Sequence, residues 1–189
     1  MDRIEFINQQ QELVRSQINR LQLLLDIPEE KLLQSVNGKW NAIEHIHHIL
    51  LTARPYLDPI EDRLKTPKKS SISTFKPGYF GNLFTKSMMP VNGEIKSPMK
   101  TLGRFDPAKS GHYPEYNNLS NQELIQKLIE TLNSVDELLE LAKTVDLNKN
   151  KVNSSLGPIF RFKLGDAFGF MIAHIERHVF LIEKSGITF

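Results

Sequence analysis

The chain has 189 residues, 40% of them hydrophobic, and this size and composition predict a single soluble domain spanning residues 1–189. Its formal net charge of +2 is too small to indicate a polyanionic partner, so we expect no nucleic-acid partner. The chain has no cysteine, which excludes disulfide bonds, zinc–thiolate sites and a cysteine nucleophile. A transition-metal site in this protein would therefore use imidazole and carboxylate ligands.

The first residues of the chain do not resemble a targeting segment. Asp2 and Glu5 are acidic and lead into a polar amphipathic pattern, unlike the basic start and apolar centre of a signal peptide. No apolar run approaches the roughly 20 residues that are needed to cross a bilayer. We therefore expect a cytoplasmic protein with no membrane partner.

The first predicted helix covers about residues 4–25, where residues of one face recur at alternating steps of three and four. One polar residue, Gln11, interrupts this otherwise apolar face. Pro28 is expected to end the helix or to start another one. The positions of the face are Ile4, Ile7, Gln11, Val14, Ile18, Leu21 and Leu25.

The second predicted helix covers residues 41–65, with Asn41 as its N-cap. Pro55 and Pro59 are expected to kink or shorten it. Two faces of this helix are candidates for burial. One face carries Ile43, Ile46, Ile49, Leu50, Ala53 and Leu57, and the other carries Trp40, Glu44, His47, His48 and Leu51.

The third predicted helix follows Ser120, which forms a capping-box signature with Glu123. The fourth runs from about Phe162 to Lys184, with Gly186 as its stop signal. We find no pattern that predicts strand pairing. The sequence therefore predicts an all-α protein, an antiparallel four-helix bundle with a long connection between helices two and three.

That connection, residues 66–119, holds six of the ten prolines and five of the ten glycines, so it cannot be regular structure throughout. We expect an ordered flap with short helical turns. Its eight basic and three acidic residues give a local charge of +5, which attracts an anionic substrate or only keeps the loop hydrated. Because the charges are scattered, hydration is favoured. The aromatic residues expected to pack this flap onto the helices are Phe75, Tyr79, Phe80, Phe84, Phe105 and Tyr113.

His174 and His178 are the most informative residues of the last helix. Residues four apart leave the same side of a helix, so both imidazoles can bind one metal ion. A third ligand must come from elsewhere, and the cluster His45, His47 and His48 is the obvious source. Periodicity alone does not choose between His47 and His48.

Residues 40–50 resemble the first motif of the DinB-like superfamily, in which a tryptophan is followed eight residues later by a histidine and then by an aliphatic residue. Here these are Trp40 and His48, followed by an isoleucine. His174 and His178, followed by apolar residues, resemble the second motif of that superfamily. The resemblance implies a four-helix bundle over the whole chain, with His48, His174 and His178 as the metal ligands.

Two acids lie near these histidines in the sequence. Glu44, one turn before His48, either accepts a hydrogen bond from that ligand's other nitrogen or is a surface acid. Glu176 lies two residues from each histidine of the pair, so we expect it to point away and not to act as a general base. The sequence after the last histidine, residues 179–181, departs from the superfamily, which often has a glutamine there.

Three residues close to His48 in the sequence are predicted to have roles other than metal ligand. His45 and His47 are predicted to face solvent or to support a ligand. Trp40 is predicted to pack in the core, because its indole buries a large apolar area.

Three neutral imidazoles leave one coordination position of a metal ion open, as in catalytic sites. Zinc or nickel is the expected divalent ion, and iron or manganese suits the same ligands. The resemblance implies either a thiol S-transferase that uses a low-molecular-weight thiol or a hydrolase, acting on a small-molecule substrate. Substrate contacts are sought among Tyr56, Tyr79, Lys86, Lys100, Arg104, Tyr113 and Arg161.

The alternative is a non-catalytic helical bundle that the metal stabilises and that acts in a stress response or binds a partner. Apolar helix surface left exposed would also allow a homodimer. A metal-dependent reaction that is lost when one ligand is replaced would distinguish the enzyme from the binding protein.

Overall fold

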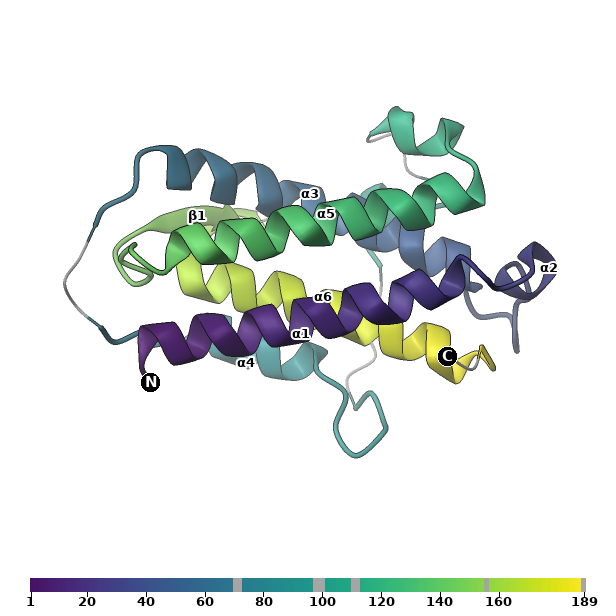
Figure 1. Cartoon of the computed structure of the whole chain (residues 1–189), viewed down its shortest axis with the longest axis horizontal. Helices are drawn as coiled ribbons and strands as arrows, with labels where there is room; N and C mark the ends of the chain where they lie inside the picture. The colour runs from purple at the N-terminus through teal and green to yellow at the C-terminus, as the bar shows by residue number, and fades with distance from the viewer. Residues whose placement is uncertain (70–72, 97–100, 110–112, 155–156, 188–189) are drawn as a thin grey trace.

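A computed structural model of the chain shows four long helices that lie side by side (Figure 1). It describes residues 1–69, 73–96, 101–109, 113–154 and 157–187. Helices α1 and α3 each contact both α5 and α6. No helix in the described ranges is long and apolar enough to span a membrane. The long helices are α1 (Arg3–Leu24), α3 (Ala42–Lys65), α5 (Asn121–Ala142) and α6 (Leu164–Lys184).

The predicted starts of α3 and α5 are confirmed by their hydrogen bonds. Asn41 Oδ1 accepts from the Glu44 amide at 2.9 Å, and Glu44 Oε2 accepts from the Asn41 amide at 2.8 Å. Ser120 and Glu123 close the same reciprocal capping box at the start of α5. Pro28 starts a short helix, α2 (Glu29–Leu32). Helix α3 continues through its two prolines to Lys65, so they do not shorten it.

The connecting segment, residues 66–119, contains the expected helical turns: α4 (Tyr79–Met88), η1 (Gly103–Phe105) and η2 (Pro114–Asn118). Phe75 and Phe105 are buried in the core as predicted. Tyr79 and Phe80 are instead 79% and 54% exposed, because α4 turns this side of its surface away from the protein. The start of α4 is fixed to α6 by Asp166, whose two carboxylate oxygens accept from the Gly78 amide at 3.1 and 3.0 Å.

The prediction of an all-α chain is wrong in one place, between α5 and α6. Here β1 (Lys151–Ser154) and β2 (Gly157–Lys163) pair as an antiparallel hairpin. Val152 is opposite Phe162, and both side chains are buried, whereas the neighbouring Asn153 and Arg161 are exposed. This alternation extends over too few residues to stand out in the sequence. The hairpin also moves the start of α6 from the predicted Phe162 to the residue after β2.

The first turn of α6 provides a test of the packing between α6 and the connecting segment. A Cβ atom added to Gly165 would lie 2.5 Å from Cζ of Phe75, whose ring is packed against Phe6. We expect Gly165→Ala to lower the free energy of unfolding by about 1–3 kcal/mol, because the buried ring has to move. Urea unfolding monitored by circular dichroism measures this change.

Gly169→Ala, one turn later in the same helix, is the matched control. Its added Cβ would lie 3.6 Å from Thr85 Oγ1, an ordinary contact. Alanine should therefore stabilise this position by about 0.5–1 kcal/mol through helix propensity. Equal effects of the two substitutions would contradict the close approach of Phe75 to Gly165.

Candidate metal centre

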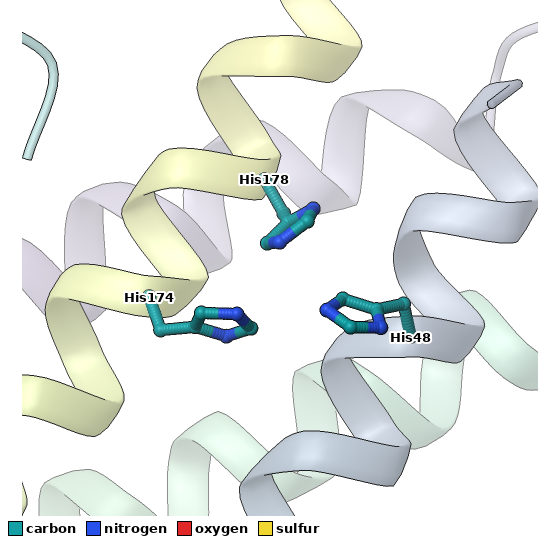
Figure 2. Close-up of side chains that lie close together, drawn as sticks. All are labelled: His48, His174 and His178. Carbon is teal, nitrogen blue, oxygen red and sulfur yellow. The ribbon is translucent and has the colours of Figure 1, made fainter. Parts of the chain in front are cut away.

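Three imidazoles converge between α3 and α6. His48 extends from α3, and His174 and His178 extend from α6, with their rings pointing toward one another (Figure 2). One ring nitrogen of each lies within 4.8 Å of the other two. Ligand nitrogens on a tetrahedral zinc ion are about 3.4 Å apart, since each bond is about 2.1 Å long. A small rotation of the rings therefore brings all three onto one ion.

The hydrogen bond at His48 determines which of its nitrogens is available. Nδ1 of His48 lies 2.7 Å from the carbonyl oxygen of Phe105 in η1. A carbonyl only accepts, so Nδ1 carries the hydrogen and Nε2 keeps its lone pair. Glu44, the candidate for this role by sequence position, does not fill it. Its carboxylate instead accepts from the Asn41 amide in the capping box.

The two histidines of α6 are held in the same way. Nδ1 of His178 lies 2.9 Å from Nδ1 of His45. Nδ1 of His174 lies 3.4 Å from the hydroxyl oxygen of Thr52, and that hydroxyl donates to the main-chain carbonyl of His48 at 2.8 Å. Each of the three rings thus has a partner at Nδ1 and directs Nε2 into the cluster. Metal-ligating histidines have this arrangement, which fixes the tautomer and the ring orientation.

Burial keeps these imidazoles neutral. Desolvation lowers the pKa of His48 to about 4, against the raising effects of the Phe105 carbonyl and of Asp106, and desolvation with the nearby charges of His48 and Arg177 lowers the pKa of His174 to about 3. The pKa of His178 is lowered well below its usual value of 6.5 by the same causes. Desolvation also lowers the pKa of His45 to about 4. Neutral imidazole is the form that binds a metal ion, so the cluster is in the binding form at neutral pH.

Of the residues around the cluster, His45 has the supporting role that was one of its two predicted roles, whereas His47 and Trp40 differ from the prediction. His45 and His47 are both buried, so neither faces solvent. His45 supports His178, whereas His47 packs toward Tyr116, with 6.4 Å between the ring centroids. Trp40 was expected in the core, but it is only partly buried and packs on the cluster, with its ring centroid 4.9 Å from that of His48.

Glu176 points away from the cluster, as predicted. Its carboxylate accepts a hydrogen bond from Gln17 Nε2 at 3.1 Å and forms an ion pair with Arg20, both on α1. The same arginine binds Glu183 at 3.2 Å. These contacts join α6 to α1 on the side opposite the imidazoles.

A cavity of about 640 Å³ adjoins the cluster, and this volume suits a small-molecule ligand. Of the proposed substrate contacts, Tyr56 lines it, and Lys100 lies outside the described residues. The others are not among its described lining residues: Tyr79, Lys86, Arg104, Tyr113 and Arg161. Sequence reasoning missed Arg177, which also lines the cavity and whose only signal is its position between the two histidines of α6.

The fold and the site together define a mostly helical protein with a three-histidine cluster beside a cavity, in which His48 and His178 are buried and His174 is partly buried. The family model of the DinB superfamily matches residues 12–182, and the chain belongs to this superfamily. The match includes all three histidines of the cluster and confirms the resemblance found in the two motifs. Neither the curated proteins nor the solved structures contain a significant match to the chain.

His45 allows the support of the cluster to be tested separately from the cluster itself. His45→Leu leaves the Nδ1 hydrogen of His178 without its acceptor. We expect metal affinity to fall by about 10–100-fold, the usual effect of removing such a partner. Competition with a chromophoric chelator measures the affinity. His47→Leu is the control, and a similar loss in both variants would contradict the role of His45.

Proposed function

We propose that this protein binds one divalent metal ion through Nε2 of His48, His174 and His178. The observation that carries the proposal is the convergence of three neutral imidazoles, each with its Nδ1 already paired. Zinc or nickel is the proposed ion, and iron or manganese suits the same donors. The scaffold is an antiparallel four-helix bundle, which the contacts of α1 and α3 with α5 and α6 support.

The ion serves catalysis, because the cluster supplies three ligands and the cavity adjoins it. When bound, a divalent ion deprotonates a coordinating thiol outright and lowers the pKa of a bound water toward about 7. The protein holds the ligand rings in place through the carbonyl of Phe105, through His45 and through Thr52. The apolar residues of the cavity wall, including Phe170 and Met171, limit the access of water to the reacting groups.

Thiol S-transfer fits the cavity wall better than hydrolysis. The described part of the wall carries no carboxylate that could act as the general acid for an alkoxide or amine leaving group in hydrolysis. An S-transfer whose leaving group departs as a stable anion, such as chloride, would need no such acid. In the transfer, the sulfur forms a bond to an electrophilic carbon, the leaving group departs with the electron pair of the broken bond, and the thiol proton goes to solvent.

A thiol-consumption assay tests this function. The protein is mixed with a low-molecular-weight thiol, such as cysteine or glutathione, and an electrophile such as monochlorobimane or 1-chloro-2,4-dinitrobenzene. We expect conjugation above the uncatalysed rate, which a chelator abolishes and added zinc or nickel restores. His174→Ala removes a proposed ligand and should abolish the activity, whereas His47→Ala should retain it.

Other results of this assay and of metal analysis would support different functions. Metal-dependent cleavage of ester or amide substrates without thiol consumption would replace S-transfer by hydrolysis. Stoichiometric metal that raises the melting temperature, with no reaction across both panels, would support the non-catalytic, metal-stabilised bundle. Absence of stoichiometric metal after purification and after reconstitution with each of the four ions would overturn the metal site.

A further inference from the structure

The charge of the cavity wall indicates what kind of molecule the cavity accepts. Within the described ranges, each charged residue that lines the cavity is a cation: Lys39, Arg177 or Lys184. The three imidazoles are neutral donors, so they would not offset the charge of a bound divalent ion either. Cations around a low-dielectric cleft raise the local concentration of anions. The electrostatic field in this cavity therefore favours a negatively charged ligand.

Three acids that neighbour lining residues, Glu176, Glu183 and Asp106, are engaged by other groups. Glu176 and Glu183, on either side of Arg177 along α6, both bind Arg20 of α1. The negative charge of Asp106 acts to raise the pKa of His48, against the larger effect of burial. Its carboxylate, however, lies 3.5 Å from the Lys109 ammonium. These three carboxylates and their two cationic partners, Arg20 and Lys109, carry a net charge of −1, which is smaller than the charge of the three cations of the wall.

Arg177 is the cation best placed to select a ligand. It lines the cavity, its side chain is buried, and it lies on α6 between His174 and His178. A guanidinium group binds a carboxylate through two parallel hydrogen bonds, with defined geometry as well as charge. Lys39 and Lys184 are exposed at the mouth of the cavity, where they can attract an anion but not orient it.

The rest of the wall is mostly apolar. It includes Met88, Leu102, Phe105, Phe170, Ile175 and Leu181. A ligand that fills the space would therefore place an apolar body against these side chains and a polar group near Arg177 and the imidazoles.

We propose that the substrate is a small carboxylate with an apolar body, whose carboxylate is bound by Arg177 beside the three-histidine cluster. This inference deepens the proposed function by naming the chemical class of one reactant. In this proposal Arg177 causes the preference for a negatively charged ligand, so the preference does not require the metal ion. Its test can therefore fail or succeed independently of the metal site.

The experiment compares two probes of the same shape, 4-phenylbutyrate and its neutral amide, 4-phenylbutyramide. Trp40, the single tryptophan of the chain, lines the cavity and reports binding through its fluorescence. We expect the wild-type protein to bind the acid about tenfold more tightly or better, as a charge-assisted hydrogen bond allows. The preference should be present in both the zinc-loaded and the chelator-treated protein, and it should decrease as salt is added.

Arg177→Met should remove most of this preference, because it weakens the binding of the acid far more than that of the amide. Arg15→Met is the matched control, because it removes the same charge from an exposed side chain of α1 that does not line the cavity. If Arg177→Met does not fold, Arg177→Lys keeps the charge without the two parallel hydrogen bonds. We then expect an intermediate preference.

Two results would overturn the proposal. Equal binding of acid and amide by folded wild-type protein, including no binding of either, would show that the cavity does not select a carboxylate. A preference that disappears on chelation would assign the carboxylate to the metal ion instead of to Arg177. In that case the proposed metal site would stand and the further inference would fall.

Discussion

His174→Ala is expected to lose its bound metal ion, with a larger effect on affinity than the loss of any residue that only supports a ligand. The variant removes one of three donors from the cluster and leaves an ion with two protein ligands. Removing only a hydrogen-bond partner of a ligand costs about 10–100-fold in affinity, so removing a ligand should cost more than about 100-fold. Elemental analysis after dialysis against metal-free buffer measures the metal content per chain.

His47→Ala is the strongest control for this experiment. His47 is adjacent to His48 and equally a buried histidine of α3, but its ring is directed toward Tyr116. This variant should keep its metal, and His48→Ala should lose it. Metal that is retained in His48→Ala and lost in His47→Ala would show that the third ligand is His47.

The long helices were predictable because their signals are local. The apolar spacing of residues 4–25 matches α1, and the capping boxes at Asn41 and Ser120 fix where α3 and α5 begin. The separation of His174 and His178 likewise determines that their rings share a side of one helix. Each of these signals can be recognised from residues that are close together in the sequence.

The remaining parts of the site depend on contacts between distant segments. Nothing near His48 in the sequence indicates that the carbonyl of Phe105, 57 residues later, holds its Nδ1. Every residue has a main-chain carbonyl, so no residue type in the sequence marks the carbonyl that binds a histidine. Periodicity could not choose between His47 and His48, because both lie on the same candidate stripe of the second helix, and only the resemblance to the superfamily motif favoured His48.

The same hydrogen bond makes the connecting segment part of the site. Phe105 belongs to η1, lines the cavity with its side chain and holds His48 with its carbonyl. A movement of η1 would therefore change both the shape of the cavity and the orientation of one imidazole. The main-chain carbonyl of Phe105 thus links the flap predicted from the sequence, residues 66–119, to the histidine cluster.

Acidification is expected to destabilise the metal-free protein strongly between about pH 6.5 and pH 3. Burial lowers the pKa of His48 to about 4 and that of His174 to about 3 in the folded chain, whereas the unfolded chain titrates near 6.5. The unfolded state therefore takes up protons first as the pH falls. The stability that the neutral rings contribute is complete above pH 6.5 and is lost toward the folded pKa values.

One pKa unit corresponds to about 1.4 kcal/mol, so the shift of His48 alone represents about 3 kcal/mol. Urea unfolding of chelator-treated protein at a series of pH values measures the slope. His174→Gln removes one of the titrating groups and should flatten this slope relative to the wild-type protein, while surface carboxylates contribute equally to both. Identical slopes for the two proteins would mean that His174 titrates alike in the folded and unfolded chains, and would contradict its burial as a neutral imidazole facing His48.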